Sequence, residues 1–458
     1  MQIFGDTTAS TAGIVITRGS DVFVNGTAAM PVVMSSADGG NISTAANNFS
    51  GYNEWGGLII DGFGVVNEGA EVLSEAAPDS VNRYFGGNDP SDDSGEIHYL
   101  VVTESGQEFR LDQEIQGLTL EGVGSGTVID HVQVHQSGDD GIEWFGGTVN
   151  AKYVVITAPD DDGLDMDLGY QGGIQFAIVK QSDTRGDRGI ESDNNGGNFD
   201  ALPRSLPTIA NITLIGDVGK PTTTTTGAYH HEGFGAFFHK AIITGGFELA
   251  CLDIDDRSDD VTAGRLSYDD SIFNCAAGSA AQEGDAGDAG ETAILAGSVT
   301  QIDPQLDADI AAQNAAAQLA SATSVTFTDV RANSDFPDAT WDDAFFTNTD
   351  YIGAVDPNDP NPWWQGWTLS EGSGSLTGTD FHPLRAEIEG GTIVPAASAN
   401  CPTGTSDAGQ MASLFGVTFP ICLLNADITA STTLTNDHVY LVSGTINVGK
   451  GGGQGVTP

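Results

Sequence analysis

The chain has 458 residues and a formal net charge of −49, from 15 basic and 64 acidic side chains. Nucleic acids and anionic lipid surfaces both require a basic patch on their protein partner, so this balance argues against both kinds of partner. Disorder is also disfavoured, because 39% of the residues are hydrophobic and only 17% are charged. The 61 glycines, about twice the usual share, indicate many turns.

Two kinds of targeting segment are not expected from this sequence. No apolar run is long enough to cross a membrane. The first residues, MQIFGDTTAS, lack the basic and apolar regions of a signal peptide, so an exported form would be a mature or trimmed chain.

Short runs of alternating apolar residues, bounded by Gly and Asp, fill the first 275 residues. They have the length, the β-branched composition and the period of two that are typical of strands. Helical periodicity is nearly absent between them, which excludes an alternating β/α fold for this part of the chain. The runs lie at 13–19, 55–62, 97–103, 128–136, 151–157, 173–180, 209–216 and 239–246.

The middle of the chain repeats a short acidic segment. DDGIE at 139–143 recurs as DDGLD at 161–165 and as DRGIE at 187–191. Each copy follows one strand and opens another. A repeat of about 20–30 residues with one or two strands per unit is the signature of a β-solenoid, in which neighbouring turns stack to bury their apolar faces. We therefore predict an all-β fold with a parallel β-helix over residues 1–275.

The composition changes after residue 275. Residues 276–400 form an insertion rich in Ala and Asp, with one predicted helix at 304–321. Residues 401–458 form a separate β segment that ends in a flexible Gly-rich tail. Three tryptophans in the insertion either pack a loop onto the solenoid or stack on sugar rings: Trp363, Trp364 and Trp367.

The four cysteines form two local pairs in the sequence, Cys251 with Cys275 and Cys401 with Cys422. Disulfides suit an exported protein, and no CxxC motif or Cys/His cluster offers a metal site instead. The alternative is four buried free thiols.

The acidic repeat predicts ladders of side chains, because equivalent positions of a solenoid stack about 4.8 Å apart. Carboxylates at that spacing repel, so the ladders are either solvated or neutralised by Arg188, by protons or by a cation. Ca²⁺ is the natural cation for such oxygen ligands. The alternative is that each Asp before Gly simply makes a turn. The candidate metal ligands are Asp139, Asp140, Glu143, Asp161, Asp162, Asp165, Asp187 and Glu191.

An enzymatic interpretation rests on the same segment. SGDDGIEW at 137–144 faintly resembles the paired-Asp segment of polygalacturonases, and two carboxyl groups are what glycoside hydrolysis needs. The other motifs of that family are not recognisable. A polysaccharide lyase would use Ca²⁺ and a basic residue such as Arg188 or Lys180, but a polyanionic substrate suits this acidic protein poorly. The cluster His230-His231-Glu232 is either a metal or acid–base group or an exposed corner. We assign no catalytic residue, and a non-enzymatic role is favoured.

Many stretches of the chain resemble a family of exported bacterial right-handed β-helix proteins of the pectate-lyase-like superfamily, which have no assigned activity. The resemblance implies a right-handed parallel β-helix and a secreted or surface location, and it supplies no catalytic residue. It is carried by the segments at 3–20, 25–36, 54–62, 122–157, 189–196, 349–355, 401–405 and 421–424.

The order of the segments departs from that family. A segment like 401–448 normally comes first and caps the helix, whereas here it lies near the C-terminus. The chain is therefore circularly permuted, or one repeat of a tandem array, or a donor whose C-terminal segment completes the first rung of a neighbouring subunit. The third arrangement predicts an extracellular structural protein that self-assembles head to tail into filaments or a surface matrix, with Ca²⁺ as a stabiliser. The alternative function is carbohydrate binding, or lyase or hydrolase activity, on the acidic solenoid face.

Overall fold

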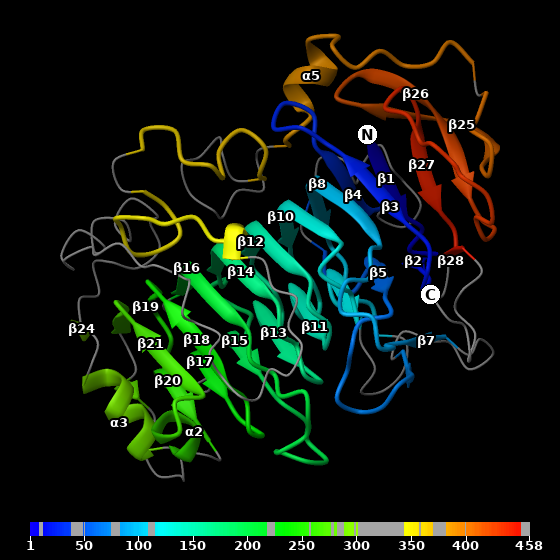
Figure 1. The fold of residues 1–458 in the computed structure, drawn as a ribbon. Coiled ribbons are helices and arrows are strands. Elements are labelled where there is room, and N and C mark those ends of the chain that lie inside the picture. Colours follow the sequence, from blue (N-terminus) through cyan, green and yellow to red (C-terminus); the bar gives the residue numbers. More distant parts are fainter. Residues whose placement is uncertain are drawn as a thin grey trace.

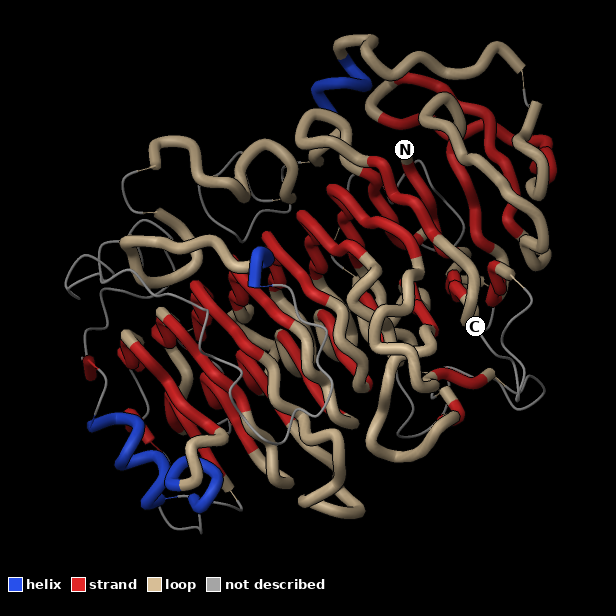
Figure 2. Tube along the Cα trace, in the orientation of Figure 1, coloured by secondary structure: helices blue, strands red, loops and turns tan. Residues whose placement is uncertain are grey.

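The computed structural model is an elongated stack of parallel strands with a β cap at one end (Figure 1). Helices are confined to short segments near the two ends and along one side (Figure 2). The parallel β-helix predicted from the repeats is thereby confirmed. The structure describes residues 1–8, 12–37, 49, 51–74, 83–108, 115–217, 225–255, 258–275, 279–281, 288–296, 299–300, 343–356, 359–369, 382–398 and 400–449.

Two long sheets carry the fold. Sheet A has the order β24-β22-β19-β16-β14-β12-β10-β8-β4-β1-β27-β26-β25, with β3, β18 and β21 paired at its side. Its strands are β1 (Gln2–Gly5), β3 (Val22–Asn25), β4 (Val32–Ser36), β8 (Gly95–Thr103), β10 (Val128–His135), β12 (Asn150–Thr157), β14 (Gly173–Lys180), β16 (Thr208–Gly216), β18 (Ala236–His239), β19 (Ile242–Gly245), β21 (Leu266–Asp269), β22 (Ile272–Cys275), β24 (Val299–Thr300), β25 (Ser406–Leu414), β26 (Val417–Leu424) and β27 (Val439–Val442).

Sheet B has the order β23-β20-β17-β15-β13-β11-β9-β5-β2-β28 and packs against sheet A across the core. Its strands are β2 (Gly13–Ile16), β5 (Leu58–Asp61), β9 (Leu118–Glu121), β11 (Ile142–Phe145), β13 (Leu164–Asp167), β15 (Arg188–Ser192), β17 (Thr226–His230), β20 (Ala250–Ile254), β23 (Ser279–Ala281) and β28 (Thr445–Val448). The remaining elements are β6 (Val72–Leu73), β7 (Tyr84–Phe85), α2 (Ser258–Thr262), α3 (Asp288–Ala296), the 3₁₀ helix η2 (Asp343–Phe345) and α5 (Arg385–Glu389).

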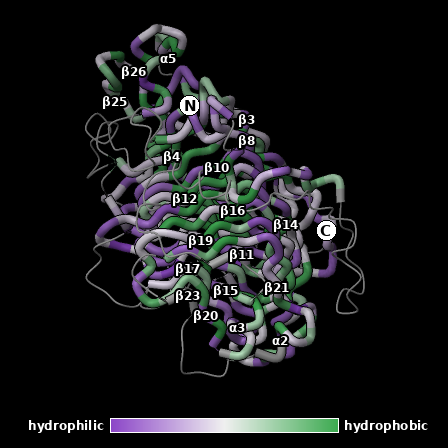
Figure 3. Tube along the Cα trace, turned by 90° about the vertical axis from the view of Figure 1, so that its left-hand side faces the viewer, coloured by the Kyte–Doolittle hydropathy of each residue, from purple (hydrophilic) through white to green (hydrophobic). Residues whose placement is uncertain are grey.

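The alternation of apolar residues is what stacks the rungs. Ile142, Leu164 and Ile190 are register partners on β11, β13 and β15, and all three side chains are fully buried. An equivalent column in sheet A includes Val134 and Ile156. Each buried aliphatic side chain contributes about 1.5–3 kcal/mol of transfer free energy, so every rung adds its own share of core. Figure 3 shows apolar residues running along the stacked strands, with hydrophilic residues in many of the connections.

The long strands of sheet A bend at one equivalent residue in each rung. His131, Tyr153 and Phe176 have positive φ angles of 56°, 58° and 60°, and each interrupts the strand register. Their rings stack on one another, with centroids 4.4 Å apart for His131 and Tyr153 and 5.1 Å apart for Tyr153 and Phe176. This aromatic stacking offsets the cost of a left-handed backbone at residues with a side chain.

The three tryptophans lie over the outer side of sheet A. Trp364 and Trp367 are buried in an apolar cluster with sheet residues such as Val155, and Trp363 is half-buried and donates from its indole nitrogen to the carbonyl of Ala354 at 2.8 Å. The packing interpretation is therefore correct for Trp364 and Trp367. Their assignment as carbohydrate-stacking residues is wrong, because their rings have no exposed face.

The cap closes the first rung of its own chain. β27 pairs with β1 and β28 pairs with β2, both in parallel, while β26 and β25 continue sheet A outwards as an antiparallel pair. The N-terminal strand therefore lies beside strands from the other end of the chain (Figure 1). In this structure the edge of β1 is paired by the cap of the same chain, as in a circular permutation, and completion of a neighbouring subunit stays a prediction.

At the other end, the sheets continue past residue 275. β23 pairs with β20 and β24 pairs with β22, and α3 packs nearby with Ile294 in the core. Both predicted disulfides are present, with Cα–Cα distances of 5.6 Å for Cys251–Cys275 and for Cys401–Cys422. The helix predicted at 304–321 and the tail at 450–458 lie outside the described residues. Among the described helices, none has the length and apolar character needed to span a bilayer.

Candidate functional site

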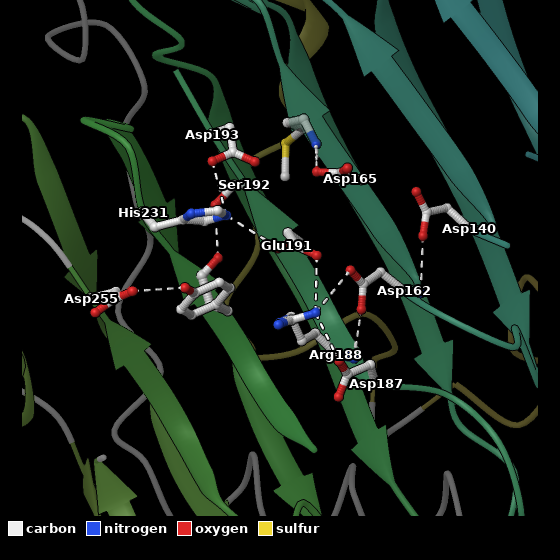
Figure 4. A network of polar contacts seen from close by, with 12 residues as sticks. Asp140, Asp162, Asp165, Asp187, Arg188, Glu191, Ser192, Asp193, His231 and Asp255 are labelled. Carbon is white, nitrogen blue, oxygen red and sulfur yellow. Dashed lines mark hydrogen bonds and ion pairs between the residues drawn. The ribbon is translucent and has the colours of Figure 1, made fainter. Parts of the chain in front are cut away.

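The acidic repeats lie on the outer face of sheet B. On β11, β13 and β15, Glu143, Asp165 and Glu191 are register partners, as the repeat predicts. Tyr229 on β17 and Asp253 on β20 extend the same column. The intervening strand residues point into the core, so the alternation that fills the core also sets these polar groups side by side on one face (Figure 4).

The second Asp of each repeat has a structural role. Asp140 Oδ1 accepts a hydrogen bond at 2.9 Å from the backbone nitrogen of Asp162. Asp162 Oδ1 accepts one at 2.6 Å from the backbone nitrogen of Arg188 in the next rung. These carboxyl groups are buried and fasten successive corners together, so their hydrogen bonds join neighbouring rungs and do not close a local turn.

Arg188 is the cation within the acidic ladder. Its Nη1 atom lies 2.8 Å from Asp187, 3.1 Å from Glu191 and 3.8 Å from Asp162. Its guanidinium also lies over the ring of Tyr229, 4.6 Å from the centroid. Burial alone would lower the pKa of Arg188, but the charges of Asp162, Glu191 and Asp187 outweigh burial and raise it. Arg188 is thus held as a cation and is not available as a base.

His231 is the second cation of the site. Its Nε2 atom lies 2.9 Å from Asp193 and 3.1 Å from Glu191, and its ring stacks on Tyr229 with centroids 4.4 Å apart. Burial would lower the pKa of His231, but the hydrogen bonds and charges of Asp193 and Glu191 raise it to about 10. His231 is therefore protonated at neutral pH.

Glu191 lies between these two cations and is the ionised carboxylate of the face. Burial would raise its pKa, but hydrogen bonds from Asp162 and His231 and the charge of Arg188 lower the pKa to about 2. In contrast, burial raises the pKa of Asp165 well above its usual value, and the neighbouring charges of Glu191 and Asp193 raise it further. The pKa values of these two carboxyl groups on neighbouring rungs are thus shifted in opposite directions.

The predicted metal ligands are brought together in part. Asp139, Asp140 and Asp161 offer oxygen atoms within 4.8 Å of one another, and so do Asp140, Glu143 and Asp165. A third group of this kind, Glu191 with Asp193 and His231, includes two residues that the repeat does not contain. Asp162, Asp187 and Glu191 contact Arg188 instead, so these three are already neutralised by an internal cation.

Burial raises the pKa of several carboxyl groups in the ladder. Burial and the charges of Asp187 and Glu191 raise the pKa of Asp161 to about 6. The pKa values of Asp140 and Asp162 are raised well above the usual value. Burial is the largest cause, and neighbouring carboxyl groups raise these values further. Burial therefore disfavours the ionised form of these groups, and a nearby cation would favour it.

Two other candidates fall outside the site. Lys180 is buried on sheet A beside Asp217, with 3.4 Å between the charged atoms, so the suggestion that it serves as a lyase base is wrong. His230 and His231 face opposite ways: His230 is buried in the core, and its ring contacts Ser192 and Tyr268 at 2.6 and 2.8 Å. Burial lowers the pKa of His230 to about 3, so it is a neutral core residue.

The sequence reasoning missed Asp193, Tyr229 and His231 as members of the acidic face. Tyr229 and His231 belong to the next rung, whose strand Thr226–His230 carries no Asp-Asp-Gly motif and follows a long connection. The available signal was the alternation in TGAYHH, which matches the outward positions of the copy at 187–191.

Comparison with known proteins gives one finding. Residues 1–302 match the model of a family described as a pectate-lyase like beta helix domain. Neither the curated proteins nor the solved structures contain a significant match.

Proposed function

Because this chain belongs to the pectate-lyase-like β-helix domain family, we propose that it is a carbohydrate-active protein whose site is the outer face of sheet B around Asp165 and Glu191. The observation that carries the proposal is geometric: Asp165 and Glu191 are register partners on adjacent rungs, and Glu191 contacts both Arg188 and His231 at 3.1 Å. Burial raises the pKa of Asp165, and the two cations lower that of Glu191. A protonated acid beside an ionised carboxylate is the pair that glycoside hydrolysis requires.

The chemistry follows from the two protonation states. Asp165 donates its proton to the glycosidic oxygen as the bond to the anomeric carbon breaks. Glu191, held ionised by Arg188 and His231, attacks that carbon to form a glycosyl ester. Asp165, now a carboxylate, takes a proton from water, which hydrolyses the ester. The backbones of register neighbours lie about 4.8 Å apart, which allows their carboxyl groups the separation of about 5–5.5 Å found in retaining enzymes, so we expect retention of configuration.

The charge of the face defines the substrate class. The chain carries −49 and the acidic ladder adds a local negative field, so a polyuronate or sulfated glycan would be repelled. A neutral polysaccharide, or one with basic amino sugars, meets no such barrier. Arg188 is engaged by three carboxylates, which also disfavours the lyase mechanism, because that reaction requires a free base.

The test is reducing-end release from a panel of neutral, amino-sugar and acidic polysaccharides. We expect release from a neutral or amino-sugar member, and a loss of at least about 100-fold in Glu191→Gln and in Asp165→Asn. Asp269→Asn, at an exposed carboxylate far along the solenoid, is the matched control and should retain full activity. If no member of the panel is cleaved, or if the two site variants act like the control, the proposal is wrong.

Cation binding is a second candidate function of the same face. It is favoured because Asp140, Glu143 and Asp165 bring oxygen atoms within 4.8 Å of one another. Burial disfavours the ionised forms of Asp140 and Asp165, and a bound cation would offset that cost. Ca²⁺ suits such a carboxylate set. We expect Ca²⁺ to raise the melting temperature relative to EDTA, and Glu143→Gln to remove most of that rise. An identical melting temperature in both buffers would mean that Ca²⁺ does not bind and that only protons and Arg188 compensate the negative charge of this face.

An extracellular location and self-assembly are further proposals. Two disulfides suit an oxidising compartment. Filaments would require residues 401–449 to leave their own β1 and β2 and pair with those of a neighbour, an exchange that conserves every strand contact. Negative-stain microscopy at high protein concentration tests this. Filaments that disappear when residues 401–458 are deleted support it, and monomers alone contradict it.

A further inference from the structure

A cavity of about 730 Å³, with apolar walls and many polar residues in its lining, lies at the cap end of the solenoid. It opens between β3 and the connection that precedes β27. Its walls are core side chains of the first rung and of the cap, and they include Ile3, Ile14, Met34, Ile428 and Val448. The volume falls within the range of about 300–1,000 Å³ that is typical of ligand sites.

One strand position is unfilled at this cavity among the described residues. In the cap rung, β27 lies on β1 and β28 lies on β2. The third strand of the first rung, β3, pairs with β8 on one edge, and no described strand pairs with its other edge. The cavity therefore has the form of a slot for one further strand, with the free edge of β3 as its side.

The hydrogen-bonding groups of this edge can be assigned from the ladder. The backbone nitrogens of Val22 and Gly26 donate to the carbonyls of Ser94 and His98 at 2.9 and 3.0 Å, on the β8 side. Because successive N–H groups of a strand alternate in direction, those of Phe23 and Asn25 point to the open side. The Phe23 side chain is 60% exposed, whereas Val24 is buried and lines the cavity.

We propose that this slot binds an extended segment of a partner polypeptide, which adds to β3 as a parallel strand and inserts alternate apolar side chains into the cavity. A strand can hydrogen-bond to the backbone edge of β3 and also pack against the apolar walls, whereas a lipid chain can only pack against the walls. The bound segment would be about four or five residues long, because β3 spans four residues.

The occupant is a different polypeptide with basic residues beside its apolar strand. Every described strand of the chain already has a partner in one of the three sheets, so the described part of a second copy offers no spare apolar strand. Asp21 lines the entrance beside β3, which favours a lysine or arginine flanking the strand.

The experiment uses the full chain and a fluorescent seven-residue peptide with valine at alternate positions, threonine between them and lysine at both ends. Fluorescence anisotropy should show saturable binding. A peptide of the same composition with its valines contiguous, and one with a central proline, should bind at least about 10-fold more weakly.

Two pairs of variants localise the binding. Phe23→Pro removes one edge donor at a position where an edge strand tolerates proline, and should weaken binding about 10-fold, whereas Phe23→Ala keeps the donor and should bind normally. Ile428→Lys, on a partly buried cap residue, blocks the cavity and should abolish binding even if Phe23→Pro does not fold. Val394→Lys, on an exposed residue away from the cavity, is its control.

Four outcomes would overturn the proposal. The first is no binding of the alternating peptide, and the second is equal binding by the contiguous-valine peptide. The third is competition by dodecanoate with no effect of Phe23→Pro, which would identify a lipid site. The fourth is binding only after deletion of 450–458 or only after dissociation of dimers, which would show that the chain itself fills the slot.

Discussion

At the scale of single residues, the acidic face depends on which carboxyl groups hold protons. Glu191 is flanked by Arg188 and His231, and its pKa falls to about 2, while burial raises the pKa of Asp165 beside it. Three rungs supply these groups, and no single segment of the sequence contains them all. The division of roles between two chemically similar residues follows from their neighbours.

His231→Gln tests the electrostatic part of this account. The pKa of His231 is about 10 when folded and about 6.5 when unfolded. Its stabilising contribution is therefore complete below about pH 6.5 and is lost as the pH rises through about 10. We expect the variant to be less stable than the wild type at pH 6, with a difference that shrinks towards pH 10. Urea unfolding across that range measures it, and a constant difference would contradict the assigned charge.

Much of the acidic ladder could be predicted from the sequence, because the repeats at 139–143, 161–165 and 187–191 fix the register of three rungs. The contribution of His231 could not, because a connection of variable length separates it from Glu191 and only folding sets their rungs side by side. The burial of these carboxyl groups could not be predicted either, because the same Asp-Asp-Gly pattern occurs in solvated turns and at desolvated carboxyl groups.

At the scale of elements, the tryptophan segment covers the outer side of sheet A. Its sequence suits a sugar-binding platform as well as a packed loop, and only the contacts with the sheet decide between them. Trp367 is fully buried, and its indole ring makes edge contacts with Tyr99 and His131.

Trp367→Ala should therefore affect stability and not glycan binding. We expect a loss of about 3–5 kcal/mol of unfolding free energy, as for other buried aromatic side chains. The half-buried Trp363→Ala should cost less and serves as the comparison. Chemical denaturation and glycan binding are measured on both variants. Weakened binding with unchanged stability would restore the sugar-stacking interpretation.

The cap is the element whose place in the chain is unusual. A cap at the C-terminus can close the first rung because β1 and β2 accept parallel partners from any part of the chain. The sequence order indicated three possible arrangements, and the register of β27 and β28 shows that the cap is able to close the first rung of its own chain.

A charged residue in the cap should expose the edge that it covers. Ile446 on β28 is buried against the core, so Ile446→Asp should detach the cap and leave β1 and β2 unpaired. We expect soluble aggregates or oligomers by light scattering, whereas Leu202→Asp, at an exposed apolar residue, should stay monomeric. If Ile446→Asp is monomeric and its melting temperature is unchanged, the cap contributes little to stability or to protection of the β1 and β2 edges.

At the scale of the whole molecule, the acidic excess affects stability as a function of pH. Burial raises the pKa of Asp61 and Asp92 to about 6 and that of Glu104 to about 7. A raised carboxyl pKa stabilises the folded state at low pH, and this contribution is lost as the pH rises through the folded value. His231 acts in the same direction at higher pH. Glu191 opposes them below about pH 4.5. The core histidines His135, His230 and His382 also oppose them, because burial lowers their pKa values to about 4, 3 and 3 and keeps them neutral in the folded state.

The contribution of Glu104 to stability should therefore be larger near pH 5 than near pH 8. Glu104→Gln keeps a hydrogen-bonding side chain beside Ser35 and removes the titrating group. We expect the melting temperature of the wild type in EDTA to exceed that of the variant by more at pH 5 than at pH 8. A difference that is constant over this range, or larger at pH 8, would contradict this account.

The central claim is that adjacent rungs of sheet B hold one ionised and one protonated carboxyl group. Carboxyl ¹³C NMR titration of the folded protein, assigned with Glu191→Gln and Asp165→Asn, tests it most directly. We predict that Glu191 stays ionised down to about pH 3 and that Asp165 keeps its proton above the usual range of an aspartate. Two groups that titrate together near pH 4 would contradict the claim and remove the basis for an acid–nucleophile pair on this face.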